Sequence, residues 1–298
     1  MTTRRRFLTI LAGAAVLPTL TNAAARWQGI ALGAKAQIIL DHPGADALIA
    51  SAVAEISRLE GLFSLHQNSQ LTRLNAAGSL ANPAPEMLEL LSICSAINAR
   101  TGGAFDPTIQ PLWALYAERF AATGTAPTAV QIAARNIGWQ HVHFSPVEVS
   151  FAKPDMALTL NGIAQGYIAD KVAALFRVEG VENVLIDTGE IMALGVAPDG
   201  AAWPVTIANS NSQIAPLSNA AIATSAPLGT SFDAAATVGH ILDPRTGQPG
   251  GHWAQVSVSA TTAALADGLS TAFCLMSAVE IQTAGEGGVY GVVTIDIA

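Results

Sequence analysis

The sequence has few charged residues, and this scarcity limits the kinds of partner it can bind. Only 12% of its 298 residues are charged, whereas 51% are hydrophobic; a typical soluble domain has roughly a quarter of its residues charged. The net charge is −8, and no basic run follows the first residues, which argues against nucleic acid as the main partner. The length suits one large domain or two small ones, and no repeat or long linker divides the chain.

Cysteine is almost absent, and the common catalytic motifs are missing. Cys94 and Cys274 are the only cysteines, and both fall in helical patterns. They could pair in an oxidising compartment, but the pattern favours two buried thiols. The sequence contains no Cys-x-x-Cys, His-Glu-x-x-His or Gly-x-Ser-x-Gly, so nothing indicates the chemistry of those motifs.

The N-terminus has the pattern of an export signal. Arginines 4–6 precede Phe7-Leu8 and an apolar run to about Leu20, and a small-residue segment ends at Ala25. This run is too short to span a membrane, and the order of the three regions predicts a signal over residues 1–25. Paired arginines before Phe-Leu are typical of a twin-arginine signal. We therefore expect a periplasmic protein whose domain comprises residues 26–298; an uncleaved N-terminal anchor is the alternative.

Hydrophobic periodicity predicts a mixed fold. Apolar residues alternate over residues 27–40, which predicts a strand, and recur at helical spacing over residues 45–63 and about 85–99. Thr128 and Gln131 form a capping-box start for a third helix. The remaining expected elements are a hairpin over 142–151, strands over 156–160, 183–196, 203–208, 220–224, 238–242, 254–260 and 289–297, helices over about 163–177 and 262–277, and a polar loop over 209–219. Because strands and helices do not alternate strictly, we expect an α+β fold.

The expected late helix has an unusual polar side. Leu265, Leu269 and Phe273 share an apolar stripe, and the other side has small residues and one carboxylate, Asp267. The Thr271 hydroxyl falls one turn further on, beside that carboxylate. A lone acid with a neighbouring hydroxyl suits Mg²⁺. The alternative is a packed helix in which Asp267 is simply hydrogen-bonded.

Three glycine-containing turns are further candidate sites. Asn161-Gly162 joins an expected strand to a helix, where free N–H groups could bind phosphate or form a plain turn. Asp243-Pro-x-x-Gly247 is a strong turn signal. His240 before it could act as a base near neutral pH or could hydrogen-bond the turn, and Arg245 could hold a phosphate or be solvated. The third turn, residues 102–107, is expected to follow a helix C-cap.

Taken together and in order, these segments resemble the ApbE family, the FAD:protein FMN transferases. Gly103-Ala-Phe-Asp106 matches a family motif of the same sequence, and His240–Gly247 and Ala266–Ala272 match two further motifs. The other matching segments are Leu32-Gly33, Phe63–Asn75, Asn161–Asp170, Asp187–Ile191 and Thr224-Ser225.

The resemblance implies a two-lobed fold with FAD between the lobes and Mg²⁺ at its pyrophosphate. It implies metal ligands from the Asp267 carboxylate, the Thr271 hydroxyl and a backbone carbonyl near Gly162. The implied FAD contacts are Leu32, His66, Ala104, Phe105, Asp106, Thr159, Gln165 and Ile241. Three of these positions depart from the family pattern, because His66 replaces Tyr, Thr159 replaces Asp, and Gln165 replaces Lys or Glu.

The resemblance also implies a reaction and a partner. A Ser or Thr hydroxyl of a partner flavoprotein would attack the FMN-side phosphorus of FAD and release AMP, with Asp267 holding Mg²⁺ and His240 as the base. The alternatives are hydrolysis of FAD to FMN and AMP, and a non-enzymatic periplasmic FAD-binding protein. Residues 161–167 and 187–191 look like the exported NosX-like subgroup linked to nitrous-oxide reduction. The implied acceptor is a domain of a respiratory or redox complex, such as a NosR-like or Rnf/Nqr-like subunit.

Overall fold

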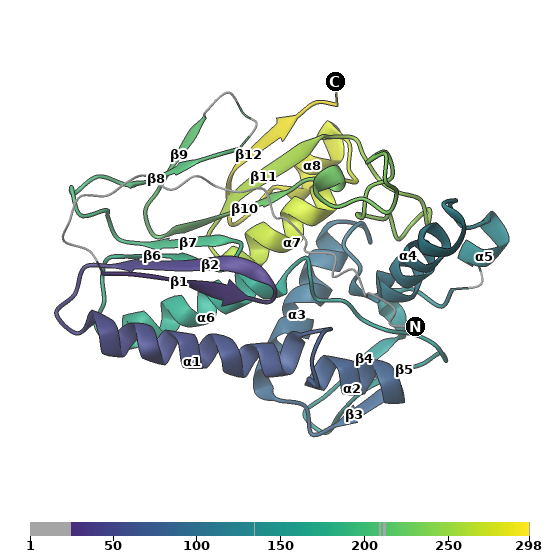
Figure 1. Ribbon diagram of the computed structural model, residues 1–298, viewed down its shortest axis with the longest axis horizontal. Coiled ribbons are helices and arrows are strands. Elements are labelled where there is room, and N and C mark those ends of the chain that lie inside the picture. The colour runs from purple at the N-terminus through teal and green to yellow at the C-terminus, as the bar shows by residue number, and fades with distance from the viewer. Residues whose placement is uncertain (1–24, 134, 209, 211–212, 298) are drawn as a thin grey trace.

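A seven-stranded antiparallel sheet forms the centre of the molecule (Figure 1). The computed structural model describes residues 25–133, 135–208, 210 and 213–297, so the expected export signal lies outside the described residues apart from Ala25. In spatial order the strands are β1 (Ala25–Ala31), β2 (Ala34–Leu40), β6 (Val184–Asp187), β7 (Ile191–Leu194), β10 (Ala220–Ser225), β11 (Gln255–Ala260) and β12 (Val289–Ile295).

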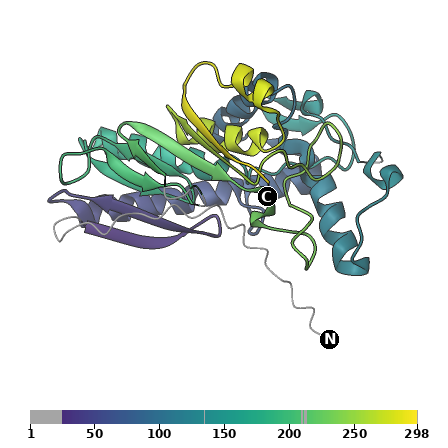
Figure 2. The same cartoon turned by 90° about the horizontal axis from the view of Figure 1, so that it is seen from above.

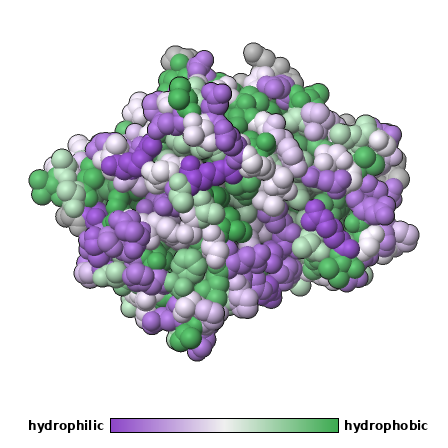
Figure 3. Space-filling view, turned by 180° about the vertical axis from the view of Figure 1, so that it is seen from behind, coloured by the Kyte–Doolittle hydropathy of each residue, from purple (hydrophilic) through white to green (hydrophobic). Residues whose placement is uncertain are grey.

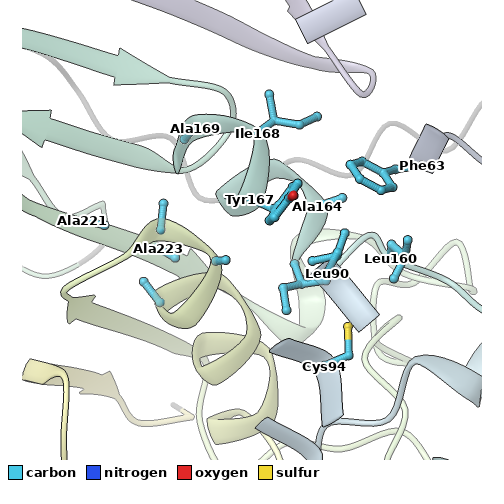
Figure 4. Close-up of a cluster of buried hydrophobic side chains, with 14 of the residues drawn as sticks. Phe63, Leu90, Cys94, Leu160, Ala164, Tyr167, Ile168, Ala169, Ala221 and Ala223 are labelled. Atoms are coloured by element: carbon cyan, nitrogen blue, oxygen red, sulfur yellow. The ribbon is translucent and has the colours of Figure 1, made fainter. Parts of the chain in front are cut away.

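Helices cover one face of this sheet and enclose the main core. They are α1 (Ala45–Phe63), α6 (Ala164–Val178) and α7 (Ala263–Phe273), with α3 (Pro85–Arg100) packed against α7. Figure 4 shows side chains of α6 between those of its neighbours, and the Phe63 and Tyr167 rings meet edge to face at 5.6 Å. The inner faces of these helices are mainly apolar, and burial of that surface is their main source of stability.

A smaller cluster covers the opposite face. The hairpin of β8 (Trp203–Thr206) and β9 (Ile214–Leu217) packs over Ile39 and Leu185 of the sheet. Trp203 is fully buried there, and its indole N–H donates to the carbonyl of Leu194. The central strands are therefore covered on both faces.

The remaining elements lie towards one end of the sheet, as Figures 1 and 2 show. A small sheet of β3 (Ser79–Ala81), β5 (Glu148–Phe151) and β4 (Val142–Phe144) carries α2 (Gln70–Ala77). Further along, α4 (Gln110–Thr123) and α5 (Ala129–Ala133) lie near the long connection between β10 and β11. The last helix, α8 (Ala278–Ala284), precedes β12.

Several expected elements differ from those observed. Residues 27–40 form two strands, because Leu32 and Gly33 both adopt a positive φ (46° and 83°) and make a two-residue hairpin turn. The apolar alternation continues in phase through that turn, so periodicity alone does not reveal it. Residues 183–196 similarly contain both β6 and β7, and the expected polar loop over 209–219 contains β9.

Two expected strands do not form. Residues 156–160 pair with no strand; instead the Asn75 side chain binds both the N–H and the carbonyl of Leu158 at 2.8 Å, and the Thr159 N–H donates to the Pro107 carbonyl. A side chain thus takes the place of a neighbouring strand. Residues 238–242 make only isolated bridges, between Ser231 and Gly239 and between Leu242 and Pro249, because the His240 backbone N–H is directed to the Pro227 and Thr230 carbonyls.

The two cysteine thiols are buried, and the surface of the molecule is mixed in hydropathy. Cys94 and Cys274 are free and fully buried, as the sequence predicts, and burial raises the pKa of both thiols. Within the described part of the chain, no helix has the length and apolar character needed to cross a membrane. The face seen in Figure 3 mixes hydrophilic and hydrophobic residues in small patches.

Candidate functional site

A cavity of about 1210 Å³ gathers most of the residues singled out from the sequence. It exceeds the roughly 300–1,000 Å³ of ordinary small-ligand pockets, so it has room for a ligand as large as a dinucleotide. The predicted site residues that line it are His66, Ala104, Phe105, Asp106, Thr159, Gly162, Gln165, His240, Ile241, Asp267 and Thr271. Leu32 does not line it; this residue forms the β1–β2 turn, where its backbone N–H donates to Glu60.

Asp267 is a carboxylate buried in the wall of this cavity. Its side chain is on α7, the residue is only 2% exposed, and Oδ2 accepts the N–H of Gly166 at 3.1 Å. Burial raises the pKa of Asp267 to about 7, and the nearby charge of Asp170 acts in the same direction. Among the described residues no Lys, Arg or His pairs with it. Such a carboxylate would be stabilised by a bound cation.

The neighbours of Asp267 complete a set of oxygen donors. Thr271 lies one turn further along α7, and its hydroxyl is 3.3 Å from that of Ser225. Gly162 packs directly against it, because a Cβ at position 162 would lie only 2.9 Å from Thr271 Oγ1. The glycine therefore brings the backbone close to the donors. Carboxylate, hydroxyl and backbone oxygens suit Mg²⁺, so these residues fit the implied ion.

The protein side chains at this site would not fill the coordination sphere of Mg²⁺ by themselves. No group of three or more His, Cys, Asp and Glu residues that could hold a metal occurs in the described ranges. Mg²⁺ is commonly bound by one or two carboxylates, with waters and substrate phosphates as its other ligands. The site therefore suits an ion shared between the protein and a phosphate-bearing ligand.

Glu190 is a second buried acid in the cavity, and the sequence analysis did not single it out. It precedes β7, is 5% exposed, and accepts the N–H of Thr224 at 3.1 Å through Oε2. Burial raises its pKa well above the usual range, and repulsion by Asp267 adds to this. The only available signal was the motif Asp187–Ile191, in which Glu190 resembles an ordinary acid in a turn. In its ionised form Glu190 would add to the negative potential around Asp267, which a bound cation would neutralise.

His240 has one ring nitrogen fixed by the backbone. Nδ1 lies 3.1 Å from the Pro227 carbonyl and 3.0 Å from the Thr230 carbonyl. Because both partners are acceptors, we assign the ring proton to Nδ1, which leaves Nε2 with a free lone pair. Burial lowers the pKa of His240, so the ring is neutral near pH 7. The residue lines the cavity, and its Nδ1 contacts show that it holds the turn; its role as a general base stays a prediction.

The other predicted polar residues have mainly structural contacts. Both oxygens of Asp106 are used, since Oδ1 accepts from Thr108 and Oδ2 from the Trp139 N–H. Arg245 is engaged by Asp243 and by the Leu275 carbonyl, and it does not line the cavity. The sequence suggests either phosphate binding or a solvated side chain for Arg245. The structure shows instead a side chain that binds Asp243 in its own turn.

Comparison with known proteins places this geometry in a family. The sequence model of the ApbE family matches residues 32–288. The chain is 30% identical over 240 residues to "FAD:protein FMN transferase" of Salmonella typhimurium, covering 74% of this chain and 69% of the relative. It is 29% identical over 262 residues to the protein of the same name from Klebsiella pneumoniae, covering 82% and 75%.

Solved structures give the same answer for the fold. The apo form of the flavinyl transferase ApbE of Pseudomonas stutzeri aligns with a TM-score of 0.81 at 27% identity, covering 92% of each chain. The flavin transferase ApbE of Vibrio cholerae aligns with a TM-score of 0.78 at 24% identity, covering 92% of this chain and 94% of the other. The expected mixed α+β fold is thereby confirmed. The sequence match over residues 32–288, together with these structures, shows that the chain belongs to the ApbE family.

Proposed function

We propose that the protein transfers FMN from FAD to a Ser or Thr hydroxyl of a partner flavoprotein and releases AMP. The observation that carries the proposal is the buried Asp267 carboxylate, unpaired with any described basic residue, in the wall of a dinucleotide-sized cavity. The relatives named "FAD:protein FMN transferase" support the reaction. An Mg²⁺ ion bound there would supply charge neutralisation at the pyrophosphate of FAD.

In this proposal each cavity residue has a limited task. Asp267, Thr271 and the backbone near Gly162 hold the ion. His66, Phe105, Gln165 and their neighbours in the lining contact the flavin or the nucleotide. Leu32, outside the lining, is proposed on the family resemblance alone.

The bond changes in the proposed reaction balance without a further reactant. The acceptor oxygen forms a bond to the FMN-side phosphorus of FAD, and the bond between that phosphorus and the bridging oxygen breaks. AMP leaves with the bridging oxygen. Nε2 of His240 takes the proton of the acceptor hydroxyl, because Nδ1 keeps its own proton against the Pro227 and Thr230 carbonyls.

The product decides between transfer and the alternatives. With FAD, Mg²⁺ and an acceptor domain carrying an Asp-Gly-x-Thr-Gly type of motif, the acceptor should gain the mass of one FMN as a phosphoester. Its band should then fluoresce as flavin on a denaturing gel. Changing the acceptor Thr to Val should erase the signal, because a methyl group cannot attack phosphorus.

Two results would redirect the proposal. Release of AMP and free FMN at one rate, with or without the acceptor, would identify an FAD hydrolase. FAD bound unchanged in the presence of Mg²⁺ and acceptor would identify a binding protein. A reaction that continued after removal of Mg²⁺ by chelation would contradict the metal's role.

We further propose that the protein is exported to the periplasm and belongs to the NosX-like subgroup, with an acceptor domain in a NosR-like or Rnf/Nqr-like subunit. The support is the order of paired arginines, apolar run and small residues before Ala25, and the segments 161–167 and 187–191. A twin-arginine signal suits a protein that folds before export.

Replacing the paired arginines tests the export route. Arg4→Lys with Arg5→Lys keeps the charge but should leave the protein in the cytoplasm, because a receptor reads the arginines themselves. Cell fractionation with immunodetection measures this, and Lys35→Arg, a like-for-like exchange in the folded domain, serves as control. Mature periplasmic protein from the double variant would point to the general secretion route.

A further inference from the structure

One face of α4 forms a wall of the cavity. Its lining residues are Gln110, Trp113, Ala114, Ala117 and Glu118. Their spacing of three, four, seven and eight residues places them on a single helical face. The only large side chain in the middle of this face is Trp113, and the two alanines beside it leave the surface next to the indole open.

Trp113 is fixed from behind by an aromatic cluster. Its ring lies 5.4 Å from that of Phe232, and Phe232 also contacts the rings of Tyr116 at 5.4 Å and Phe120 at 6.1 Å. The Tyr116 hydroxyl donates to the Gly247 carbonyl at 3.0 Å. Leu112, Leu115, Tyr116 and Leu242 form the buried centre of this cluster. The indole is therefore held by packing on one side while the residue lines the cavity on the other.

Hydrogen bonds hold the segment that carries Phe232 in place. Asp233 accepts hydrogen bonds from the backbone N–H groups of Thr237 and Val238 and from the Thr237 hydroxyl. Phe232 donates its own N–H to the Val238 carbonyl at 2.9 Å. A side chain whose support is already ordered loses little freedom when a ligand stacks on it.

We propose that Trp113 stacks on one of the two flat ring systems of FAD, the isoalloxazine or the adenine, and that this contact sets the affinity of the cavity for FAD. The inference rests on the proposed function. FAD has a ring system on each side of its pyrophosphate, so an ion near Asp267 would leave both rings to be held elsewhere in the cavity. An indole flanked by alanines is a suitable surface for such a ring.

The first test measures binding without turnover, in the presence of Mg²⁺ and with no acceptor. Trp113→Ala should raise the Kd for FAD about tenfold or more, the usual loss when one ring-stacking partner is removed. Trp113→Phe should keep the Kd within about threefold of the unchanged protein, because a flat ring remains. FMN and ADP as separate probes identify the ring, since only the fragment that stacks should lose affinity in Trp113→Ala.

A second variant pair blocks the wall while leaving the indole in place. Ala117→Leu fills the space beside Trp113 and should weaken FAD binding, whereas Ala121→Leu, the same change at an exposed position of α4 outside the cavity, should not. Trp27→Phe controls for the loss of a tryptophan, because Trp27 is on β1 and does not line the cavity. Thermal unfolding of each variant shows whether the fold is kept.

The outcomes separate the inference from the proposed function. Unchanged FAD affinity in both Trp113→Ala and Ala117→Leu would overturn the stacking role while leaving the transfer reaction intact. Failure of the unchanged protein to bind FAD, FMN or ADP would instead remove the proposed function. Selective loss of FMN binding in Trp113→Ala assigns the isoalloxazine to α4, and selective loss of ADP binding assigns the adenine.

Discussion

Asp267→Ala is expected to reduce FMN transfer to the level of the reaction without enzyme. Asp267 is the carboxylate that lies one turn from Thr271 on α7, and without it the proposed ion loses its charged protein ligand. Asp267→Asn tests the charge with almost no change of shape. The measurement is the initial rate of flavin labelling at limiting Mg²⁺, with Asp41→Ala, an exposed carboxylate outside the cavity, as control.

The raised pKa of Asp267 predicts how the stability of the fold depends on pH and Mg²⁺. Its pKa of about 7 in the folded protein is above the roughly 3.9 of an unfolded Asp. In the metal-free protein the contribution of Asp267 to stability is fully present below about pH 4 and is lost as pH rises from about 4 to 7. Mg²⁺ binds the ionised form, so it should raise the Tm more at pH 8 than at pH 6.

Two variants show whether that response comes from Asp267. The Mg²⁺-dependent rise in Tm should disappear in Asp267→Asn. Thr271→Val should weaken it less, because a neutral ligand is lost and the side-chain shape is kept. Near-normal turnover of Asp267→Ala at limiting Mg²⁺ would contradict the metal assignment.

The fold could be predicted from the sequence where local pattern and tertiary packing agree. The bounds of α1 match the predicted 45–63, because its apolar residues recur at helical spacing and all face one core. The prediction fails where the local structure depends on contacts with residues that are distant in the sequence or on a backbone conformation that the side chain disfavours. Leu32 takes a positive φ that its side chain disfavours, and residues 156–160 bind Asn75 instead of another strand.

The helix α4 shows a second reason for failure. It was not predicted, because apolar residues occur on both of its sides and give no single stripe. One side, with Leu112 and Tyr116, packs into the aromatic cluster, and the other side carries Trp113 and two alanines into the cavity. A helix between a small core and a ligand cavity loses the amphipathic pattern on which sequence reasoning depends.

In the candidate site, too, local spacing could be predicted and long-range contacts could not. The spacing of four residues between Asp267 and Thr271 predicts that they are neighbours, and both line the cavity. Glu190 could not be identified in this way, because its burial depends on the approach of β10 and the Thr224 N–H. The proximity of Gly162 to Thr271 is likewise a contact between α7 and a turn more than one hundred residues earlier.

His240→Asn is expected to slow transfer by about a hundredfold or more, the usual contribution of a positioned base, while FAD binding is kept. Asparagine can replace the Nδ1–H with an amide N–H directed to the Pro227 and Thr230 carbonyls. The turn is therefore preserved and the basic Nε2 is lost. Separate measurements of FAD affinity and of the single-turnover rate distinguish an effect on binding from an effect on the chemical step. His143→Asn, on the exposed side of β4, is the matched control.

The pH profile gives an independent check on this role. Burial lowers the pKa of His240 below its ordinary 6.5, so most of the base is neutral at pH 7, where Asp267, with a pKa of about 7, is half ionised. At limiting Mg²⁺ the unchanged protein should lose activity on acidification through pH 7 because Asp267 is protonated. Saturating Mg²⁺ should move this loss to lower pH, since metal binding favours the carboxylate. In His240→Asn the residual rate should keep the Mg²⁺-dependent limb. Equal single-turnover rates for His240→Asn and the unchanged protein would leave His240 as a residue that only holds its turn.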